Sequence, residues 1–257
     1  LEDIKLEIMH RLHETEKHEN VRILMAIESG SRAWGFESTN SDYDVRFIYV
    51  RNKDWYVAVD FEEKRDVIEY EITDEIDLNG WDVRKSLRLF RKSNPAFVEW
   101  IQSPITYIES GAFRKQALSL LPDIYSIEKG IYHYRSMAKT NYRRYLRSDL
   151  VPLKKYFYVL RPLLSIRWLE SKKSPAPIEF NKLFEFIDNS ELQQAIDDLL
   201  EKKKSSLELT KGPAIPVLNK FIESELERLE SFNPTKVNTN TGTEQLNNLF
   251  HMVLNEK

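Results

Sequence analysis

Asp42 and Asp44 are the side chains whose type and spacing most clearly suggest chemistry. They are two residues apart, and Asp44 lies in an apolar run that ends at Val50. On a strand, this spacing places both carboxylates on one face. Neighbouring carboxylates repel each other unless a cation lies between them. Because Mg²⁺ and Mn²⁺ prefer oxygen ligands, the pair predicts a site for one of these dications.

A third carboxylate on a neighbouring strand would complete a site for two ions. In two-metal enzymes the ions lie ~4 Å apart and stabilise the attacking and the leaving oxygen. Asp77 is the expected third ligand, because it lies between two apolar residues in the next β-like segment. Glu75 is the alternative, although alternation along that segment points it to the other face.

Gly30 and Ser31 supply a complementary feature. They follow an apolar run of strand length at 21–27 and lead into a short segment at 31–36. A glycine at the end of a strand lets the backbone approach a ligand, and the N–H groups and the serine hydroxyl can reach phosphate oxygens. An isolated Asp-x-Asp pair is common in solvated turns. A phosphate-binding turn between two strands, about a dozen residues before such a pair, instead predicts phosphoryl or nucleotidyl transfer.

The elements that position these residues form an α+β pattern. An amphipathic helix is expected at 1–18, followed by strands at 21–27, 43–50, 66–73 and 75–78 and by helices at 83–92 and around 97–101. Asp82 is the expected N-cap of the helix at 83–92. Beyond about residue 112 the pattern is helical, with segments at 113–121, 130–147, 154–170, 179–187, 190–204, 215–231 and 244–254 and a turn-rich stretch after Pro234.

These elements predict two domains. Residues 1–110 should form a small mixed sheet with flanking helices, and residues 111–257 an all-helical, substrate-binding domain, with the boundary between Ser103 and Gln116. Pro162 lies inside the segment 154–170 and predicts a kink or a restart of that helix.

Composition excludes several classes of protein. The 38 Lys and Arg against 41 Asp and Glu give a net charge of −3, which argues against a polybasic protein, and 12% aromatic residues demand a packed core. The absence of cysteine excludes thiol catalysis, cysteine-bound zinc and disulfides. No apolar run approaches the ~18 residues of a membrane span, and the first residues are too charged for a signal peptide. We therefore expect a cytoplasmic protein without a membrane partner.

Residues 130–173 stand out, because eleven Lys and Arg face only two acids there. Aromatic residues are interleaved with them, and Lys154, Tyr158, Arg161 and Ser165 recur at helical spacing. Basic groups beside stacking rings suit a nucleoside triphosphate or single-stranded nucleic acid. For single residues the alternative is an aromatic core with solvated cations. The residues expected to help bind the nucleotide are Lys139, Lys155, Tyr158 and Arg161.

The order strand, Gly-Ser, short helix, Asp-x-Asp strand and later a lone acid resembles the DNA polymerase β nucleotidyltransferase superfamily. The blocks 30–36, 41–49, 80–85 and 93–104 are similar, more narrowly, to the YcgL/RlaP-type predicted nucleotidyltransferases, a group associated with RNA repair. The resemblance is specific over about 20–110 and weaker through 134–139 and 154–162. It implies that Asp42, Asp44 and Asp77 are metal ligands and that Gly30 and Ser31 hold the triphosphate. Arg32 belongs to the narrower pattern and adds charge near the phosphates.

The resulting hypothesis is an Mg²⁺-dependent enzyme with two ions. It would transfer a nucleoside monophosphate from an NTP to a hydroxyl, release pyrophosphate, and use an RNA end as acceptor. One alternative is nucleotidylation of a protein or small molecule, as in toxin-like modifiers. Another is a non-catalytic nucleotide- or RNA-binding module that uses the basic segment alone.

Overall fold

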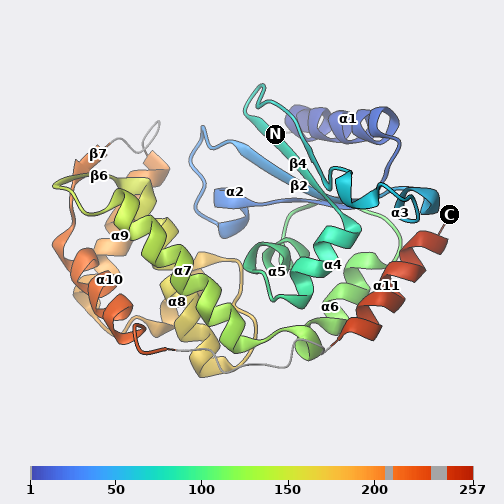
Figure 1. The fold of residues 1–257 in the computed structure, drawn as a ribbon. Coiled ribbons are helices and arrows are strands. Elements are labelled where there is room, and N and C mark those ends of the chain that lie inside the picture. Colours follow the sequence, from blue (N-terminus) through green and yellow to red (C-terminus); the bar gives the residue numbers. More distant parts are fainter. Residues whose placement is uncertain (1, 206–210, 233–241, 257) are drawn as a thin grey trace. The chain divides into compact units, whose positions relative to one another are not determined.

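The structure is a computed structural model, and it describes residues 2–205, 211–232 and 242–256. The turn-rich stretch expected after Pro234 lies outside the described residues up to 241. The chain divides into two compact units (Figure 1). The first unit comprises Leu1–Ala33, Asp42–Tyr125 and Asn238–Lys257, and the second comprises Trp34–Ser41 and Ser126–Val237.

The first unit is built on a five-stranded sheet in the order β3-β4-β2-β1-β5. The strands are β1 Arg22–Glu28, β2 Tyr43–Val50, β3 Val67–Glu69, β4 Ile76–Asp82 and β5 Thr106–Glu109. Strand β2 runs parallel to β4, whereas β1 is antiparallel to both β2 and β5, and β3 is antiparallel to β4. The sheet is therefore mixed, as expected, and its one parallel pair joins the strands of Asp44 and Asp77.

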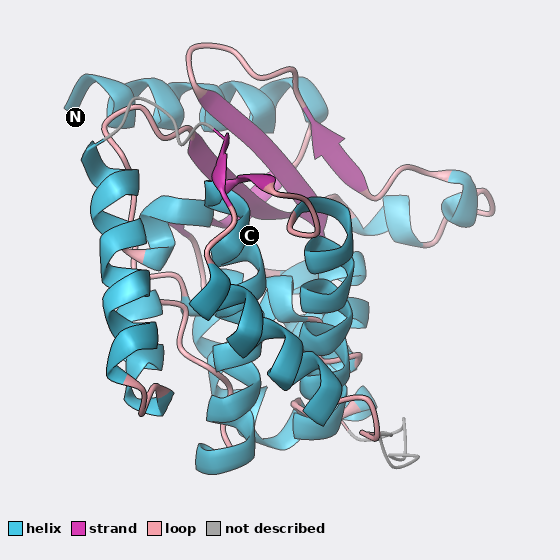
Figure 2. Ribbon diagram, turned by 90° about the vertical axis from the view of Figure 1, so that its left-hand side faces the viewer, coloured by secondary structure: helices cyan, strands magenta, loops and turns pink. Residues whose placement is uncertain are grey.

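Helices cover both faces of this sheet (Figures 1 and 2). One face packs on α1 Glu2–Glu19, whose Ile8 and Leu12 are buried against Phe47 and Tyr49. The other face packs on α4 Val83–Arg91, α5 Pro95–Gln102, α6 Phe113–Ile124 and α11 Thr243–Asn255. Six successive residues of β1 are buried, because this strand lies inside the sheet and both of its faces are covered. Three short elements complete the unit: α2 Gly30–Trp34, α3 Lys53–Tyr56 and the 3₁₀ helix Phe61–Glu63.

The N-cap predicted for α4 is confirmed. The carboxylate of Asp82 accepts a hydrogen bond of 2.8 Å from the backbone N–H of Arg84, and Asn94 caps α5 in the same way. Strand β5 was not predicted, since its four residues lack both strict alternation and full burial. Strand β4 is longer than its apolar run, because Asn79, Gly80 and Trp81 continue the pairing with β2.

The second unit is mainly helical. Helix α7 Ile127–Tyr145 packs along α8 Phe157–Lys172, and α9 Ser190–Ser205 and α10 Pro216–Arg228 complete the bundle. The segments 153–156 and 180–186 form 3₁₀ helices. Helix α8 continues through Pro162 without a break, so the expected restart is wrong. Proline is tolerated there because it lies near the start of the helix, where it removes a single backbone hydrogen bond.

The two units differ from the division expected near residue 110. Helices α6 and α11 lie in the first unit, because Phe113, Ala117, Leu246 and Leu249 are buried in the core beneath the sheet. The second unit also contains a two-stranded antiparallel sheet of β6 Leu150–Pro152 and β7 Lys211–Pro213, so it is not purely helical. The fold class is α+β. Within the described residues, no helix is long and apolar enough to cross a membrane.

Candidate active site

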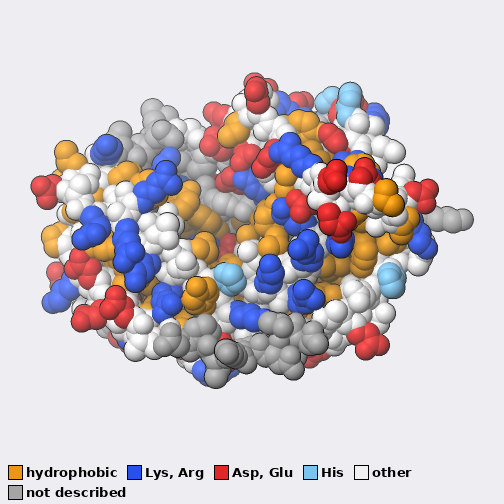
Figure 3. Space-filling model, in the orientation of Figure 1, with side chains coloured by type: hydrophobic (Ala, Val, Ile, Leu, Met, Phe, Trp, Pro, Cys, Tyr) orange, Lys and Arg blue, Asp and Glu red, His pale blue; other side chains and the backbone are white. Residues whose placement is uncertain are grey.

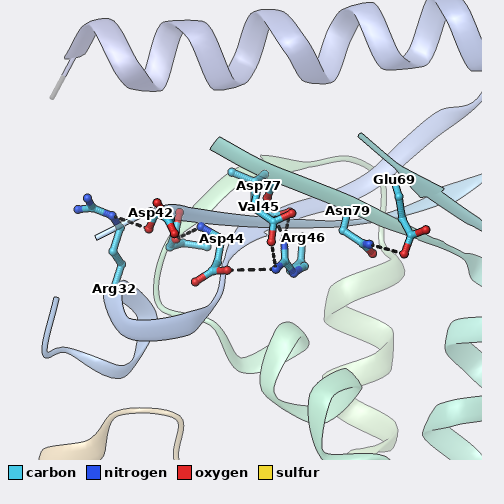
Figure 4. Close-up of polar contacts among 9 residues, drawn as sticks. Arg32, Asp42, Asp44, Val45, Arg46, Glu69, Asp77 and Asn79 are labelled. Atoms are coloured by element: carbon cyan, nitrogen blue, oxygen red, sulfur yellow. Dashed lines mark hydrogen bonds and ion pairs between the residues drawn. The ribbon is translucent and has the colours of Figure 1, made fainter. Parts of the chain in front are cut away.

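Asp44 and Asp77 lie directly opposite each other on the parallel strands β2 and β4 (Figure 4). Their side chains leave the sheet on the face that α4 and α5 cover. On β4 Asp77 alternates with buried Ile76 and Leu78, which face α1. Both side chains are partly open to solvent, at 32% for Asp44 and 27% for Asp77. The structure thus brings together two of the three predicted metal ligands.

Arg46 connects these two carboxylates (Figure 4). Its Nη2 donates to Asp77 Oδ2 at 2.6 Å and to Asp44 Oδ1 at 3.1 Å. Its Nη1 donates to the backbone carbonyls of Asp77 and Val45, at 2.9 and 3.1 Å. Because the backbone holds the guanidinium in place, Arg46 fixes the orientation of both acids. Sequence reasoning missed this residue, although the period of two that aligns Asp42 with Asp44 extends to Arg46.

Asp42 and Arg32 lie at the start of β2 (Figure 4). The side chain of Asp42 is exposed. Arg32 reaches back from α2, so that its guanidinium lies 3.8 Å from the ring centre of Tyr43 and its Nε donates to the backbone carbonyl of Asp42 at 3.3 Å. Arg32 therefore brings positive charge to the edge of the acidic site.

Gly30 packs directly against Asp44. Its φ of +59° is in the left-handed region that favours glycine, and a Cβ at this position would lie 1.9 Å from Asp44 Oδ2. The neighbouring Ser29 donates its backbone N–H to the carbonyl of Asp44 at 2.8 Å. Ser31, the next residue, is half-buried. The predicted phosphate-binding turn and the predicted metal ligand are therefore adjacent, and their contact requires a glycine.

Glu28 lies behind this contact and is fully buried. It accepts a 2.8 Å hydrogen bond from the backbone N–H of Asp44 and another from the hydroxyl of Tyr107. Burial raises the pKa of Glu28 from 4.5 to about 7, against the lowering effect of these hydrogen bonds. Sequence reasoning missed this acid, although a glutamate that ends a wholly apolar strand just before a glycine is an identifiable signal.

The donor set suits a dication, although no three Asp, Glu or His side chains form a ready-made metal site in the described part of the chain. Arg46 binds one oxygen of each acid, so Asp44 Oδ2 and Asp77 Oδ1 are not used by it. Burial raises the pKa of Asp44, as does repulsion from Asp77 and Asp42, while Arg46 and Arg32 lower it. A cation beside Asp44 would offset the same costs, so these residues fit a divalent ion.

In the second unit, three of the four predicted basic and aromatic residues gather around Trp34. The ring of Tyr158 meets that of Trp34 edge-on at 5.7 Å, and the guanidinium of Arg161, which is 3% exposed, lies 4.6 Å from the Trp34 ring. Lys155 Nζ lies 4.2 Å from the Tyr158 ring. Desolvation lowers the pKa of Lys155, and the nearby Lys154 and Arg144 lower it further. We call Trp34, Lys155, Tyr158 and Arg161 the Trp34 cluster.

Lys139 does not belong to the Trp34 cluster. It lies on α7, where its Nζ is 3.8 Å from Glu230, and it lines a different groove together with Arg143, Arg147 and Glu223. Trp34 itself was not predicted as a site residue. Trp34 reaches Tyr158 and Arg161 because the segment 34–41 belongs to the second unit. No local sequence pattern predicts that assignment.

The protein is a nucleotidyltransferase of the DNA polymerase β type. More narrowly, the chain belongs to the RlaP family, described as the RNA repair pathway DNA polymerase beta family, whose model matches residues 4–252. An uncharacterized protein of Bacillus subtilis strain 168, YcgL, is 43% identical over 96% of this chain and 95% of its own length. Among solved structures, a nucleotidyltransferase-like protein from Exiguobacterium sibiricum is 12% identical and covers 87% of this chain and 75% of its own. Its TM-score of 0.31 is too low to support a conclusion.

Proposed function

We propose that this nucleotidyltransferase transfers a nucleoside monophosphate from an NTP to a hydroxyl of an RNA end. The observation that carries the proposal is that Gly30 packs against Asp44 and that Asp44 lies opposite Asp77, which combines a tight backbone turn with two carboxylates on parallel strands. A polyphosphate and a hard cation are the ligands that such a combination suits. Membership of a family described by RNA repair supports RNA as the acceptor.

In this reaction the acceptor oxygen forms a bond to the α-phosphorus of the NTP. The bond between that phosphorus and the oxygen bridging to the β-phosphate breaks, and pyrophosphate leaves. The hydroxyl proton passes to a carboxylate oxygen of the site or to water. Asp42 and Asp44 would hold two Mg²⁺ or Mn²⁺ ions, and Asp77 would bind the one nearer the acceptor. Such ions, when bound, lower the pKa of the attacking hydroxyl and neutralise the departing pyrophosphate.

The protein's own groups orient the reactants. The Gly30 backbone and the Ser31 hydroxyl would hold the β- and γ-phosphates, and Arg32 would balance their charge from the start of β2. Arg46 keeps Asp44 and Asp77 in fixed rotamers through its four hydrogen bonds. A site that is held in place before the substrate arrives needs little rearrangement during the reaction.

The Trp34 cluster would bind nucleotide within the second unit. It combines two aromatic rings with two cations, a combination that suits a nucleobase and its phosphates. Tyr158→Ala should raise the KM for NTP several-fold and leave kcat nearly unchanged. A loss of kcat with an unchanged KM would contradict this role. Lys139, which is paired with Glu230, should contribute little.

The reaction is tested by incubating the protein with α-labelled NTPs, Mg²⁺ and RNA of defined 3′ ends. Asp44→Asn and Asp77→Asn should each lower label transfer by at least ~100-fold, because they remove charge that must face the ions. Asp74→Asn is the matched control, since Asp74 is exposed, lies three residues before Asp77 and contacts Arg11. Equal transfer by Asp44→Asn and Asp74→Asn would refute the proposal.

The acceptor is identified by offering all four NTPs with tRNA, other RNA 3′ ends, proteins and no added acceptor. Label on RNA supports the proposal. Label on protein, or on the enzyme itself, would favour the alternative of protein nucleotidylation. Binding of RNA without transfer under any condition would favour a non-catalytic module.

A further inference from the structure

A second feature of the first unit is a groove of about 630 Å³ between α4 and α11. Arg84, Arg88 and Arg91 line it from α4, and Asn247, Phe250 and His251 line it from α11. Figure 3 shows several Lys and Arg side chains on this face, over α4 and α5. The groove contains none of the predicted active-site residues.

The three arginines share one helix face. Residues four and seven positions apart on an α-helix project within a narrow sector, and α4 carries no acid that would neutralise them. Arg84 is engaged, with its guanidinium 4.2 Å from the Phe61 ring and 3.8 Å from Glu62. Arg88 is exposed, Arg91 is half-buried, and no acid of the described residues forms an ion pair with either. The groove therefore presents two uncompensated cations.

Apolar side chains lie between the arginines and α11. Leu87, Leu246 and Phe250 line the same groove. The hydroxyl of Thr243, at its α11 side, is buried without a hydrogen-bond partner among the described residues. Cations beside an aromatic ring form the combination with which proteins bind single-stranded nucleic acid, since phosphates meet the cations and bases stack on the ring.

The groove lies on the active-site side of the sheet. Asp77, Asn79 and Trp81 alternate along the face of β4 that α4 and α5 cover. Helix α4 follows the end of β4 immediately, and the strand rises by about 17 Å from Asp77 to Asp82. The start of α4 is therefore about the length of the strand away from Asp77, and the groove shares no lining residue with the active site, so a ligand held there is not the reacting group itself.

We propose that this groove binds the phosphate backbone of single-stranded RNA at a distance from its reacting end. The identity of the ligand as RNA rests on the proposed function, whereas the charge and lining of the groove do not. Arg88 and Arg91 contact phosphates, and Phe250 supports a base. The groove is thus a docking surface for the body of the acceptor.

Binding is measured by fluorescence anisotropy of a labelled single-stranded RNA of about 15 nucleotides, with EDTA and without NTP. Each phosphate contact with a single strand contributes about 0.7 to the slope of log Kd against log salt concentration. The double variant Arg88→Gln with Arg91→Gln should reduce that slope by about 1.4 and weaken Kd roughly 20-fold at 0.1 M salt. The matched control is Lys5→Gln with Lys17→Gln, which removes the same charge from exposed sites on α1, across the sheet.

An unchanged slope in the groove variant, or an equal loss in the α1 control, would overturn the proposal, as would a wild-type protein that binds no RNA. A photo-crosslink from 4-thiouridine in RNA to peptides of α4 or α11 of the wild-type protein supports it without any variant, whereas crosslinks only elsewhere contradict it. The proposal for the groove and the proposed function can be tested separately. Asp44→Asn should abolish label transfer and still bind RNA normally, so RNA binding does not depend on the transfer reaction.

Discussion

The Cα of Gly30 lies so close to Asp44 that an added Cβ would be 1.9 Å from Asp44 Oδ2. A turn and a strand fourteen residues apart in the sequence are thus in direct contact, and the contact exists only because position 30 has no side chain. The turn predicted to bind phosphate and the candidate metal ligand must therefore keep a fixed distance.

Gly30→Ala should displace Asp44 and lower nucleotidyl transfer by at least ~100-fold, since shifts of about 1 Å at a reacting centre have effects of this size. Gly35→Ala is the matched control. Gly35 also has a positive φ, of +83°, but an added Cβ there meets nothing within 4 Å. It should cost about 1 kcal/mol of unfolding free energy from backbone strain and keep the activity. Similar activity losses in both variants would show that strain alone is responsible.

Local patterns predicted those parts of the site that lie on single elements. The apolar runs of β1 and β2, the glycine turn and the Asp82 cap could be identified because each depends on neighbours within a few residues. Asp77 was also predicted to lie near Asp44, from its place between two apolar residues of a strand, and the structure places it directly opposite Asp44. These features explain why the order of the main elements from α1 to α5 was predicted, although α3, the 3₁₀ helix Phe61–Glu63 and β5 were missed.

Features that depend on pairing between distant segments could not be predicted. Arg46 reaches Asp77 only because β2 and β4 run parallel in one particular register, and nothing in either strand specifies it. Helix α11 returns to the first unit, where the carbonyl of Val253 accepts a hydrogen bond from Arg22 across 231 residues of sequence. Likewise, Trp34 and Phe36 join the second unit through rings of α8, with Phe36 stacked on Phe157 at 4.6 Å.

Glu28 predicts how stability depends on pH. Its pKa is raised from 4.5 to about 7 by burial, so between these values the folded protein binds a proton that the unfolded chain releases. The unfolding free energy should therefore fall by up to about 3 kcal/mol as the pH rises from 4.5 to 7, and stay level above that range.

Urea unfolding at pH 5 and pH 8, in EDTA, measures this dependence. Glu28→Gln keeps an acceptor for Tyr107 and should remove most of the difference between the two pH values. Glu63→Gln makes the same change at an exposed position and should preserve it. If the unfolding free energy of Glu28→Gln falls between pH 5 and pH 8 by as much as that of the wild-type protein, Glu28 does not titrate as described.

Glu225 forms the buried ionic centre of the second unit. Its side chain is 4% exposed and accepts hydrogen bonds from Arg167 at 2.9 Å and from Arg228 at 3.0 Å. Glu225→Ala should lower the unfolding free energy by about 2 kcal/mol, because Arg167 and Arg228 each lose a hydrogen bond to a buried carboxylate. Glu170→Ala removes the more exposed acid that also pairs with Arg228 and should cost less than about 1 kcal/mol. Equal costs in thermal or urea unfolding would contradict this ranking.

Arg46 should set the acid limb of the pH–rate profile. Asp44 must be ionised to bind a cation, and Arg46 lowers its pKa against the opposing effects of burial, Asp77 and Asp42. Arg46→Ala should raise the pKa of Asp44 further, so the rise of kcat/KM with pH should move to higher pH. We expect transfer to fall roughly tenfold at pH 6 and by less at pH 8.5. Both proteins need the ionised form of Asp44, and the variant reaches that form only at a higher pH.

The control is Arg65→Ala, which breaks an exposed ion pair with Glu69 on the neighbouring strand β3 and should leave the profile unchanged. Arg46→Lys keeps the positive charge but loses the second nitrogen, which anchors the side chain to the backbone carbonyls of Val45 and Asp77. It should therefore restore the position of the acid limb better than it restores the maximal rate. That separation distinguishes the charge of Arg46 from its role in orienting Asp44 and Asp77. A uniform loss of rate at every pH in Arg46→Ala would instead assign it an orienting role alone.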